Sequence, residues 1–163
     1  MKDEARLSNA YKAELLNGRD DAFELIWNHN KEIGRDLSDD ELKNGIKKFL
    51  SLGDAIGIIE QKKLIAFAVL YCRHYESLIA YICNVYVLPE YRGNSLSGLL
   101  LEKAFEIALN KGFKSIQLHV NEDNRPAITV YTRYGFVPTG NIKKENGEKE
   151  IEMIAECVGT VKG

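Results

Sequence analysis

The spacing of apolar residues changes along the chain, and this change constrains the fold more than any other feature. Between residues 38 and 53, apolar positions recur every three or four residues, as in an amphipathic helix. From residue 55 to residue 87, three β-rich runs follow one another with short connections, as in an antiparallel meander. After Pro89, helical and alternating segments take turns to the C-terminus. The pattern predicts an α/β (α+β) fold with a mixed central sheet flanked by helices.

The boundaries of these elements follow from residues that cap or break them. Ser38 to Glu41 has the form of a capping box, Gly53 and Gly112 suit helix C-termini, and Pro89 cannot continue a strand. The predicted order is therefore β, α, α, β, β, β, α, β, α, β, β. We expect strands at about 11–16, 55–60, 64–71, 78–87, 115–120, 136–142 and 150–156, and helices at about 20–34, 38–53, 97–111 and 125–134.

Length, charge and hydropathy narrow the class of protein. The 163 residues predict a single domain over 1–163, with residues 1–10 as a loose polar arm. The net charge of −2 argues against a general nucleic-acid binder. The sequence has no apolar run of about 18 residues that could span a membrane, and its charged N-terminus does not look like a signal peptide. These features predict a soluble cytoplasmic protein.

The cysteines and histidines do not have the spacing of a metal site. No C-x-x-C pair and no closely spaced pair of histidines occurs. We therefore expect reduced thiols and no metal. The cysteines are Cys72, Cys83 and Cys157, and the histidines are His29, His74 and His119.

The segment from Val85 to Leu100 carries the clearest chemical signal. A strand stops at Pro89, a loop of small residues follows, and an apolar helix begins at once. Such a loop exposes backbone N–H groups at the positive end of the helix dipole, and small residues let a bulky anion approach. With the guanidinium of Arg92, the segment predicts a phosphate or pyrophosphate site. By itself it is equally compatible with an ordinary β–α connection capped by a serine, and it lacks the motif of a P-loop nucleotidase.

This segment resembles the first signature of the GNAT superfamily of N-acetyltransferases, in which a strand, a proline turn and an Arg-Gly loop lead into a helix. A second signature of that family follows after the expected helix and alternating strand. The likeness covers residues 54–156 well and the first 50 residues only by the order of elements. The first signature is matched by Val87, Pro89, Tyr91, Arg92 and Gly93, and the second by Asn121, Asn124, Ala127, Tyr131, Gly135 and Phe136.

The resemblance implies an acetyl-CoA-dependent N-acetyltransferase, with the pantetheine arm between two splayed parallel strands that end at Val87 and Val120. Backbone groups of Val85 and Val87 would bind the pantetheine and the acyl carbonyl, and Asn124 would reach the pantetheine from the far side. A primary amine would attack directly, and Tyr131 would protonate the leaving thiolate. Without the resemblance, Tyr131 would more simply be a core aromatic. The cofactor-binding loop would consist of Arg92, Gly93, Asn94, Ser95, Leu96, Ser97 and Gly98.

The chain departs from the GNAT pattern in the loop and on the preceding strand. Ser95 and Ser97 stand where the family usually has glycine, or glycine and alanine, and a serine is strained if its φ is positive. Cys83 stands where many members carry a glutamate base, and it either packs as a small apolar residue or is acylated. Cys83, Val85 and Val87 share one face of the strand unless a bulge intervenes. The base is left open among Glu76, Glu122, Asp123 and no base at all.

The other expectations concern the first helices and the partners. Phe23, Ile26 and Trp27 lie on one predicted apolar face, and His29, Arg35 and Asp36 are expected on the solvated surface. The acceptor would be a small-molecule or peptide amine, without nucleic-acid or membrane partners, and a homodimer through the C-terminal strands is compatible with the resemblance. Two other functions stay open: a non-catalytic acyl-CoA-binding or sensor module of the same fold, and an α/β protein that binds no coenzyme A.

Overall fold

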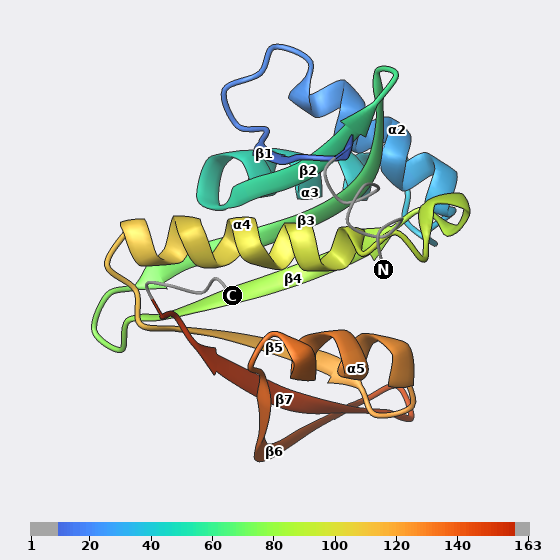
Figure 1. The fold of residues 1–163 in the computed structure, drawn as a ribbon. Coiled ribbons are helices and arrows are strands. Elements are labelled where there is room, and N and C mark those ends of the chain that lie inside the picture. The colour runs from blue at the N-terminus through green and yellow to red at the C-terminus, as the bar shows by residue number, and fades with distance from the viewer. Residues whose placement is uncertain (1–9, 159–163) are drawn as a thin grey trace. The chain divides into compact units, whose positions relative to one another are not determined.

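The computed structural model describes residues 10–158, and its elements follow the predicted order (Figure 1). Most of the predicted N-terminal arm lies outside the described residues. The strands are β1 (Ala13–Leu15), β2 (Asp54–Glu60), β3 (Lys63–His74), β4 (Ile79–Val87), β5 (Ser115–Asn121), β6 (Val137–Glu145) and β7 (Glu148–Glu156). The helices are α2 (Ala22–Ile33), α3 (Asp39–Leu52), α4 (Leu96–Asn110) and α5 (Arg125–Arg133), with a 3₁₀ turn, η1 (Pro89–Tyr91), before α4.

Hydrogen bonds join the seven strands in the order β1-β2-β3-β4-β5-β7-β6. The β4–β5 pair is parallel, whereas β1–β2, β2–β3, β5–β7 and β6–β7 are antiparallel. The predicted mixed, mostly antiparallel sheet with one parallel pair is therefore confirmed. Within residues 10–158, no helix is both long and apolar enough to cross a membrane.

The described chain forms two compact units. The first unit contains the residues up to Tyr71 together with Asn84–Lys103, and the second contains Cys72–Cys83 together with the residues from Ala104 onward. The single-domain expectation over 1–163 stays a prediction. Each unit is described separately below.

The first unit is built on an antiparallel meander. Strand β2 pairs with β1 from Ala13↔Ile58 and with β3 from Asp54↔Leu70. Gln61 and Lys62, which join β2 to β3, have positive φ values of 49° and 66°, so they match the twist of a tight hairpin. Strand β3 is buried without alternation over 64–70, which explains its continuous apolar run.

Helix α2 of the first unit buries a different face from the one predicted. Phe23 and Trp27 are only half-buried and stack on each other with ring centroids 6.1 Å apart. The buried stripe instead has the three- and four-residue spacing of a helix but includes two polar residues, which sequence reasoning had assigned to the surface or passed over. The side chains buried by α2 are Ala22, Leu25, Ile26, His29 and Asn30.

The start of α3 is held as predicted. Ser38 Oγ accepts a hydrogen bond from the Glu41 backbone N–H at 3.1 Å, and Glu41 Oε2 accepts one from the Ser38 N–H at 3.0 Å. This reciprocal pair satisfies two N–H groups that a helix start leaves without partners.

The second unit contains a sheet with one apolar and one polar face. In β5, Ile116, Leu118 and Val120 are buried, whereas Gln117 and His119 lie on the opposite, half-buried face. Strand β7 pairs with the full length of β5, from Ser115↔Glu156 to Asn121↔Glu150. The β6–β7 register shifts between Pro138 and Ile142.

Candidate active site

Strand β4 is irregular at Asn84, just before the first motif begins. Asn84 has a positive φ of 57°, and its side-chain oxygen accepts a hydrogen bond from Arg35 Nη1 at 3.3 Å. The regular burial alternation ends there, because residues 83–86 are all half-buried. The condition attached to the prediction for Cys83, Val85 and Val87 therefore applies: the strand is irregular between Cys83 and Val85, and simple alternation does not put them on one face.

The segment from the end of η1 into the first turn of α4, which we call the anion-binding loop (residues 92–98), is shaped by two left-handed residues. Gly93 has φ 89° and Ser95 has φ 60°. The Asn94 side-chain amide donates to the Tyr91 carbonyl at 3.0 Å and closes the turn. Because successive N–H groups can converge in such a loop, this geometry suits an anion. It also means that Ser95 bears the strain that the sequence departure raised.

Arg92 folds back onto the end of β4. Its Nε donates to the Val87 carbonyl at 3.1 Å, and its guanidinium carbon lies 5.2 Å from the centre of the Tyr86 ring. These contacts hold a positive charge beside the anion-binding loop. They also engage the Val87 carbonyl that the resemblance assigns to the pantetheine.

The positive end of α4 has no acidic side chain in its first turn. The N–H groups of Leu96, Ser97 and Gly98 have no acceptor within the helix, as at any helix start. The first turn contains no acidic residue, in contrast to α3, which has three there. Sequence, loop conformation and helix dipole therefore agree on an anion-binding position.

The second motif, in the second unit, starts α5 in another way. Asn124 Oδ1 accepts a hydrogen bond from the Ala127 N–H at 3.3 Å, so the residue caps the helix as predicted. Further along the helix, Tyr131 is 8% exposed and its ring lies 5.8 Å from that of Phe136. Burial raises the pKa of the Tyr131 phenol to about 12, which keeps it protonated at neutral pH.

A polar cluster on the sheet of the second unit was missed by sequence reasoning. Tyr81 Oη lies 2.7 Å from His119 Nδ1, and His119 Nε2 lies 3.4 Å from Glu152 Oε2. The three residues come from β4, β5 and β7, and the strand register His119↔Glu152 aligns the last two. The alternation of β5 could have shown that His119 leaves the apolar face. It could not have supplied the partners, because the pairing of three strands is not readable from one sequence.

The profile of the Acetyltransferase (GNAT) family matches residues 18–136, well over half of the chain. The chain belongs to the GNAT family of acetyltransferases. The resemblance inferred from the two signatures is confirmed.

Curated GNAT relatives match parts of the chain. A protein named as a ribosomal protein bS18-alanine N-acetyltransferase of Bacillus subtilis (strain 168) is 36% identical over 77 residues, which are 45% of this chain and 51% of that protein. The mycothiol acetyltransferase of Jonesia denitrificans is 30% identical over 129 residues, 76% of this chain and 39% of that protein. The thialysine N-epsilon-acetyltransferase of Mus musculus is 36% identical over 55 residues, 34% of this chain and 32% of that protein. The matched regions thus span about half or less of these relatives.

Solved GNAT structures share the fold. The ribosomal-protein-S18-alanine N-acetyltransferase from Escherichia coli superposes with a TM-score of 0.74 at 18% identity, covering 92% of this chain and 96% of that one. An acetyltransferase of the GNAT family from Streptococcus pneumoniae gives 0.70 at 19% identity, covering 91% and 99%. At these identities the likeness establishes the architecture alone.

The GNAT family uses acetyl-CoA as cosubstrate, and the residues of the first motif fit its anionic part. The anion-binding loop offers backbone donors, a guanidinium beside them and no acidic side chain in the first turn of α4. Gly93 has no atom within 4 Å of where a Cβ would stand, so the loop is open on that side. Within residues 10–158, no group of three or more His, Cys, Asp and Glu side chains is placed so that it could hold a metal ion.

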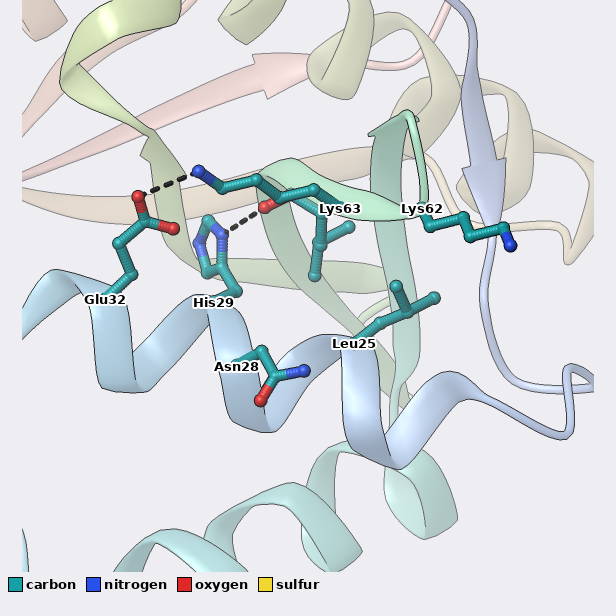
Figure 2. Close-up of a pocket in the computed structure, with 7 residues that line it drawn as sticks. Leu25, Asn28, His29, Glu32, Lys62 and Lys63 are labelled. Atoms are coloured by element: carbon teal, nitrogen blue, oxygen red, sulfur yellow. Dashed lines mark hydrogen bonds and ion pairs between the residues drawn. The ribbon is translucent and has the colours of Figure 1, made fainter.

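A second feature of the first unit is a cavity of about 290 Å³ between α2 and the β2–β3 turn (Figure 2). His29, expected on the surface, is 2% exposed at its wall, and its Nδ1 lies 2.9 Å from the Leu64 carbonyl. Nε2 is buried with no hydrogen-bond partner among the described residues. Figure 2 shows His29 and Glu32 directed toward Lys63, with Asn28 turned away. Lys63 Nζ binds Glu32 at 2.9 Å and Glu90 of η1 at 3.4 Å, so the rim of this cavity is tied to the turn before the anion-binding loop.

The acidic residues considered as bases lie on turns. Glu76 is exposed after β3, and Asp123 is exposed before α5. Glu122 Oε2 lies 3.4 Å from Lys149 Nζ and is half-buried. None of the three lies in a side-chain cluster comparable with that of Tyr81, His119 and Glu152.

Proposed function

We propose that this GNAT protein transfers an acetyl group from acetyl-CoA to a primary amine by direct attack. The observation that carries the proposal is the anion-binding loop: Gly93 and Ser95 in left-handed conformations, Arg92 beside them and a helix start without an acidic residue. Backbone donors at a helix N-terminus favour a pyrophosphate. Family membership supplies the identity of the ligand that carries it.

The cosubstrate contacts are assigned to the residues of both motifs. The N–H groups of the anion-binding loop bind the pyrophosphate, and Gly98 keeps the helix start narrow. Backbone groups of Val85 and Val87 bind the pantetheine and the acyl carbonyl, and the amide of Asn124 reaches the pantetheine as well. Because Arg92 already donates to the Val87 carbonyl, the Val87 N–H is the group of that residue on which the proposal depends.

Tyr131 acts as the general acid. Loss of coenzyme A as a thiolate requires a proton, and a phenol whose pKa is raised to about 12 carries that proton throughout the neutral range. Its burial among apolar side chains, including Phe136, shields the proton from water. Backbone N–H donors stabilise the negative charge that develops on the thioester oxygen.

The acceptor is a small-molecule or peptide amine. Relatives carry names with alanine, thialysine or mycothiol as the acetylated group, so both protein termini and small molecules occur among them. The net charge of −2 favours a cationic amine over an anionic one, weakly. A homodimer through the C-terminal strands and a cytoplasmic location remain predictions.

The first experiment is a thermal-unfolding titration with acetyl-CoA, with free coenzyme A and ATP as controls. At about a hundred times its dissociation constant, a ligand adds about 2.7 kcal/mol of stability, which raises the unfolding temperature by several degrees. A saturable rise with both coenzyme A species and none with ATP supports the site. No rise at millimolar acetyl-CoA would contradict the proposal at its first step.

The second experiment measures acetylated product on a panel of amines: a peptide with N-terminal alanine, thialysine, lysine and spermidine. Tyr131→Phe should lower kcat by about a hundredfold or more and leave acetyl-CoA binding unchanged, because it removes only the hydroxyl group that supplies the proton. Binding without product on any amine would favour the alternative, a non-catalytic acyl-CoA-binding or sensor module. Cys83 in place of the family's glutamate and the two serines of the loop, Ser95 and Ser97, favour this alternative, and Ser95 is strained at its positive φ of 60°.

A further inference from the structure

We infer that Tyr86 is a positioning residue for the cosubstrate: its ring holds the guanidinium of Arg92 beside the anion-binding loop, where the charge meets the phosphate groups of acetyl-CoA. The inference rests on the proposed function, because the guanidinium has a ligand there only if an anionic cosubstrate binds. Tyr86 lies outside the anion-binding loop, and neither GNAT signature includes it. Tyr86, Arg92 and the residues that support them all belong to the first unit.

The side chain of Arg92 is exposed, and a side chain of this length and flexibility can adopt many conformations in water. Two contacts hold it in the structure. Its Nε donates to the Val87 carbonyl at 3.1 Å, and its guanidinium carbon lies 5.2 Å from the centre of the Tyr86 ring. Both partners are neutral, so they orient the guanidinium without cancelling its charge.

The two contacts on Arg92 have different effects. The hydrogen bond to Val87 fixes the Nε atom, and it leaves the two Nη groups with the forked donor geometry that suits a phosphate. The aromatic ring fixes the rest of the group, because a cation over a ring within about 6 Å is attracted by the ring's quadrupole. Tyr86 therefore limits where the Nη groups can point.

The Tyr86 ring is itself fixed from the core of the first unit. It packs against His29 with ring centroids 6.0 Å apart and an interplanar angle of 81°. His29 is 2% exposed, its Nδ1–H donates to the Leu64 carbonyl at 2.9 Å (Figure 2), and its ring lies 5.8 Å from that of Phe67. Perpendicular aromatic pairs at such distances prefer one arrangement. A buried residue of α2 thus orients a half-buried ring, and that ring orients an exposed cation.

The backbone of Arg92 is fixed without any contribution from the Tyr86 ring. The Arg92 N–H donates to the Pro89 carbonyl at 3.3 Å, and the Leu88 N–H donates to the Ile65 carbonyl at 2.9 Å. Loss of the Tyr86 ring should therefore free the guanidinium and preserve the path of the chain through η1. Positioning of the charge and folding of the loop can then be separated by experiment.

The test measures the dissociation constant of acetyl-CoA by isothermal titration calorimetry on the full chain. Tyr86→Leu and Tyr86→Met remove the ring, whereas Tyr86→Phe keeps an aromatic face. Arg92→Gln removes the charge, and the variant with both Tyr86→Leu and Arg92→Gln completes a double-mutant cycle. Thermal unfolding without ligand shows whether each variant is folded, and the methionine variant provides a second, more flexible filling of the space left by the ring.

The matched control is Trp27→Leu. Trp27 is a half-buried aromatic residue of the same unit and has a cation of its own, since Lys31 Nζ lies 5.4 Å from the centre of its ring. The control therefore removes the same kind of contact from a cation that does not belong to the anion-binding loop. It should bind acetyl-CoA as the wild type does.

Tyr86→Leu and Tyr86→Met should each weaken acetyl-CoA binding by about threefold to thirtyfold, the range of a cation–π contact. Tyr86→Phe should stay within about twofold of wild type, because phenylalanine offers a similar face to the guanidinium. Arg92→Gln should weaken binding at least as much as Tyr86→Leu, since a positioning residue contributes no more than the group it positions. In the Arg92→Gln background, Tyr86→Leu should have almost no further effect.

Three results would overturn the inference. The first is binding within about twofold of wild type in both variants that lack the ring. The second is a loss in Tyr86→Phe as large as in Tyr86→Leu, which would assign the effect to the hydroxyl group. The third is a full loss from Tyr86→Leu in the Arg92→Gln background, which would mean that Tyr86 acts on something other than Arg92. A wild type that binds no acetyl-CoA would instead overturn the proposed function, and this inference would fall with it.

Discussion

The two units of the chain differ in the hydrogen-bond partners of their helix starts and of their sheltered histidines. Each has one turn that leads from a strand into a helix and one sheltered histidine. In the first unit, the start of α4 has no acidic residue in its first turn, and His29 Nε2 has no partner among the described residues. In the second unit, Asn124 caps α5, and both ring nitrogens of His119 face side-chain oxygens.

In the first unit, N–H groups at the start of α4 and the Nε2 atom of His29 have no partner among the described residues. In the second unit, the corresponding groups lie against side-chain oxygens of the protein. Unsatisfied backbone donors at a helix start are cheap when exposed to water and are available to an anion. A capped helix has less to offer a ligand but is more stable. Under the proposed function, the first unit holds the anionic part of the cosubstrate, and the second positions Tyr131 for proton transfer.

The largest expected effect comes from placing a negative charge in the first turn of α4. Ser97→Asp should weaken acetyl-CoA binding by about fivefold to several-hundredfold, because two like charges about 4 Å apart repel by about 1–4 kcal/mol near a protein surface. The same carboxylate should stabilise the unliganded protein by a few tenths of a kcal/mol through the helix dipole. Isothermal titration calorimetry and urea unfolding measure the two effects separately.

Ser97→Ala is the control for that substitution, because it removes the hydroxyl and adds no charge. If backbone N–H groups bind the pyrophosphate, this variant should bind acetyl-CoA as the wild type does. If Ser97→Asp binds acetyl-CoA with unchanged affinity, the start of α4 does not bind the anionic part of the cosubstrate, and the proposed difference between the two units is wrong.

The next effect concerns His29 of the first unit, whose Nε2 is buried without a hydrogen-bond partner among the described residues. Burial lowers the pKa of His29 below its ordinary value of 6.5, so the unfolded chain binds this proton more tightly than the folded one. Stability should therefore be complete above about pH 6.5 and decline as pH falls toward the lowered folded value, by at most about 1.4 kcal/mol per pH unit. Urea unfolding at several pH values measures this slope.

Two variants test whether His29 causes that slope. His29→Gln, which cannot titrate, should flatten the pH dependence even if it lowers stability at pH 7. His74→Gln, which alters an exposed ring, should retain the wild-type slope. A slope that survives in His29→Gln would assign the acid sensitivity to other groups.

Much of this contrast could be predicted from sequence, and the part that could not has a physical reason. The capping box at Ser38, the cap at Asn124 and the glycines that end helices act over three or four residues, so one sequence is enough to find them. The two GNAT signatures are equally local. Their presence in α/β context predicted both the element order and the mixed sheet.

The features that were missed depend on contacts between distant segments. His29 looked like a surface residue because its partner, the Leu64 carbonyl, is 35 positions away. Tyr81 and His119 are 38 positions apart, and only strand pairing brings them together. The irregularity of β4 at Asn84 was foreseen as a condition but not located, because the tolerance of asparagine for a positive φ is too weak a signal to mark one position.

A smaller effect is expected at the capped helix of the second unit. Asn124→Ala should lower the free energy of unfolding by about 1 kcal/mol, because the Ala127 N–H loses its acceptor. Asn124→Asp keeps the acceptor and should keep the stability. Urea unfolding of both variants decides the matter: equal stability of the alanine and aspartate variants would mean that the cap contributes nothing.

The smallest effect is expected at Ser95, whose backbone is strained by its positive φ in the turn before α4. A left-handed residue with a side chain costs about 1–2 kcal/mol, and glycine avoids this cost but loses about 0.5–1 kcal/mol through the freedom of the unfolded chain. Ser95→Gly should therefore raise the free energy of unfolding by about 0.5–1 kcal/mol, whereas Ser95→Ala, which keeps a Cβ at φ 60°, should leave it nearly unchanged. If Ser95→Ala instead lost about 1 kcal/mol, the hydroxyl would be capping α4, and the two helix starts would be alike rather than different. Urea unfolding of the two variants beside the wild type therefore distinguishes two cases. Either the N–H groups at the start of α4 are available to an anion, or the Ser95 hydroxyl caps them.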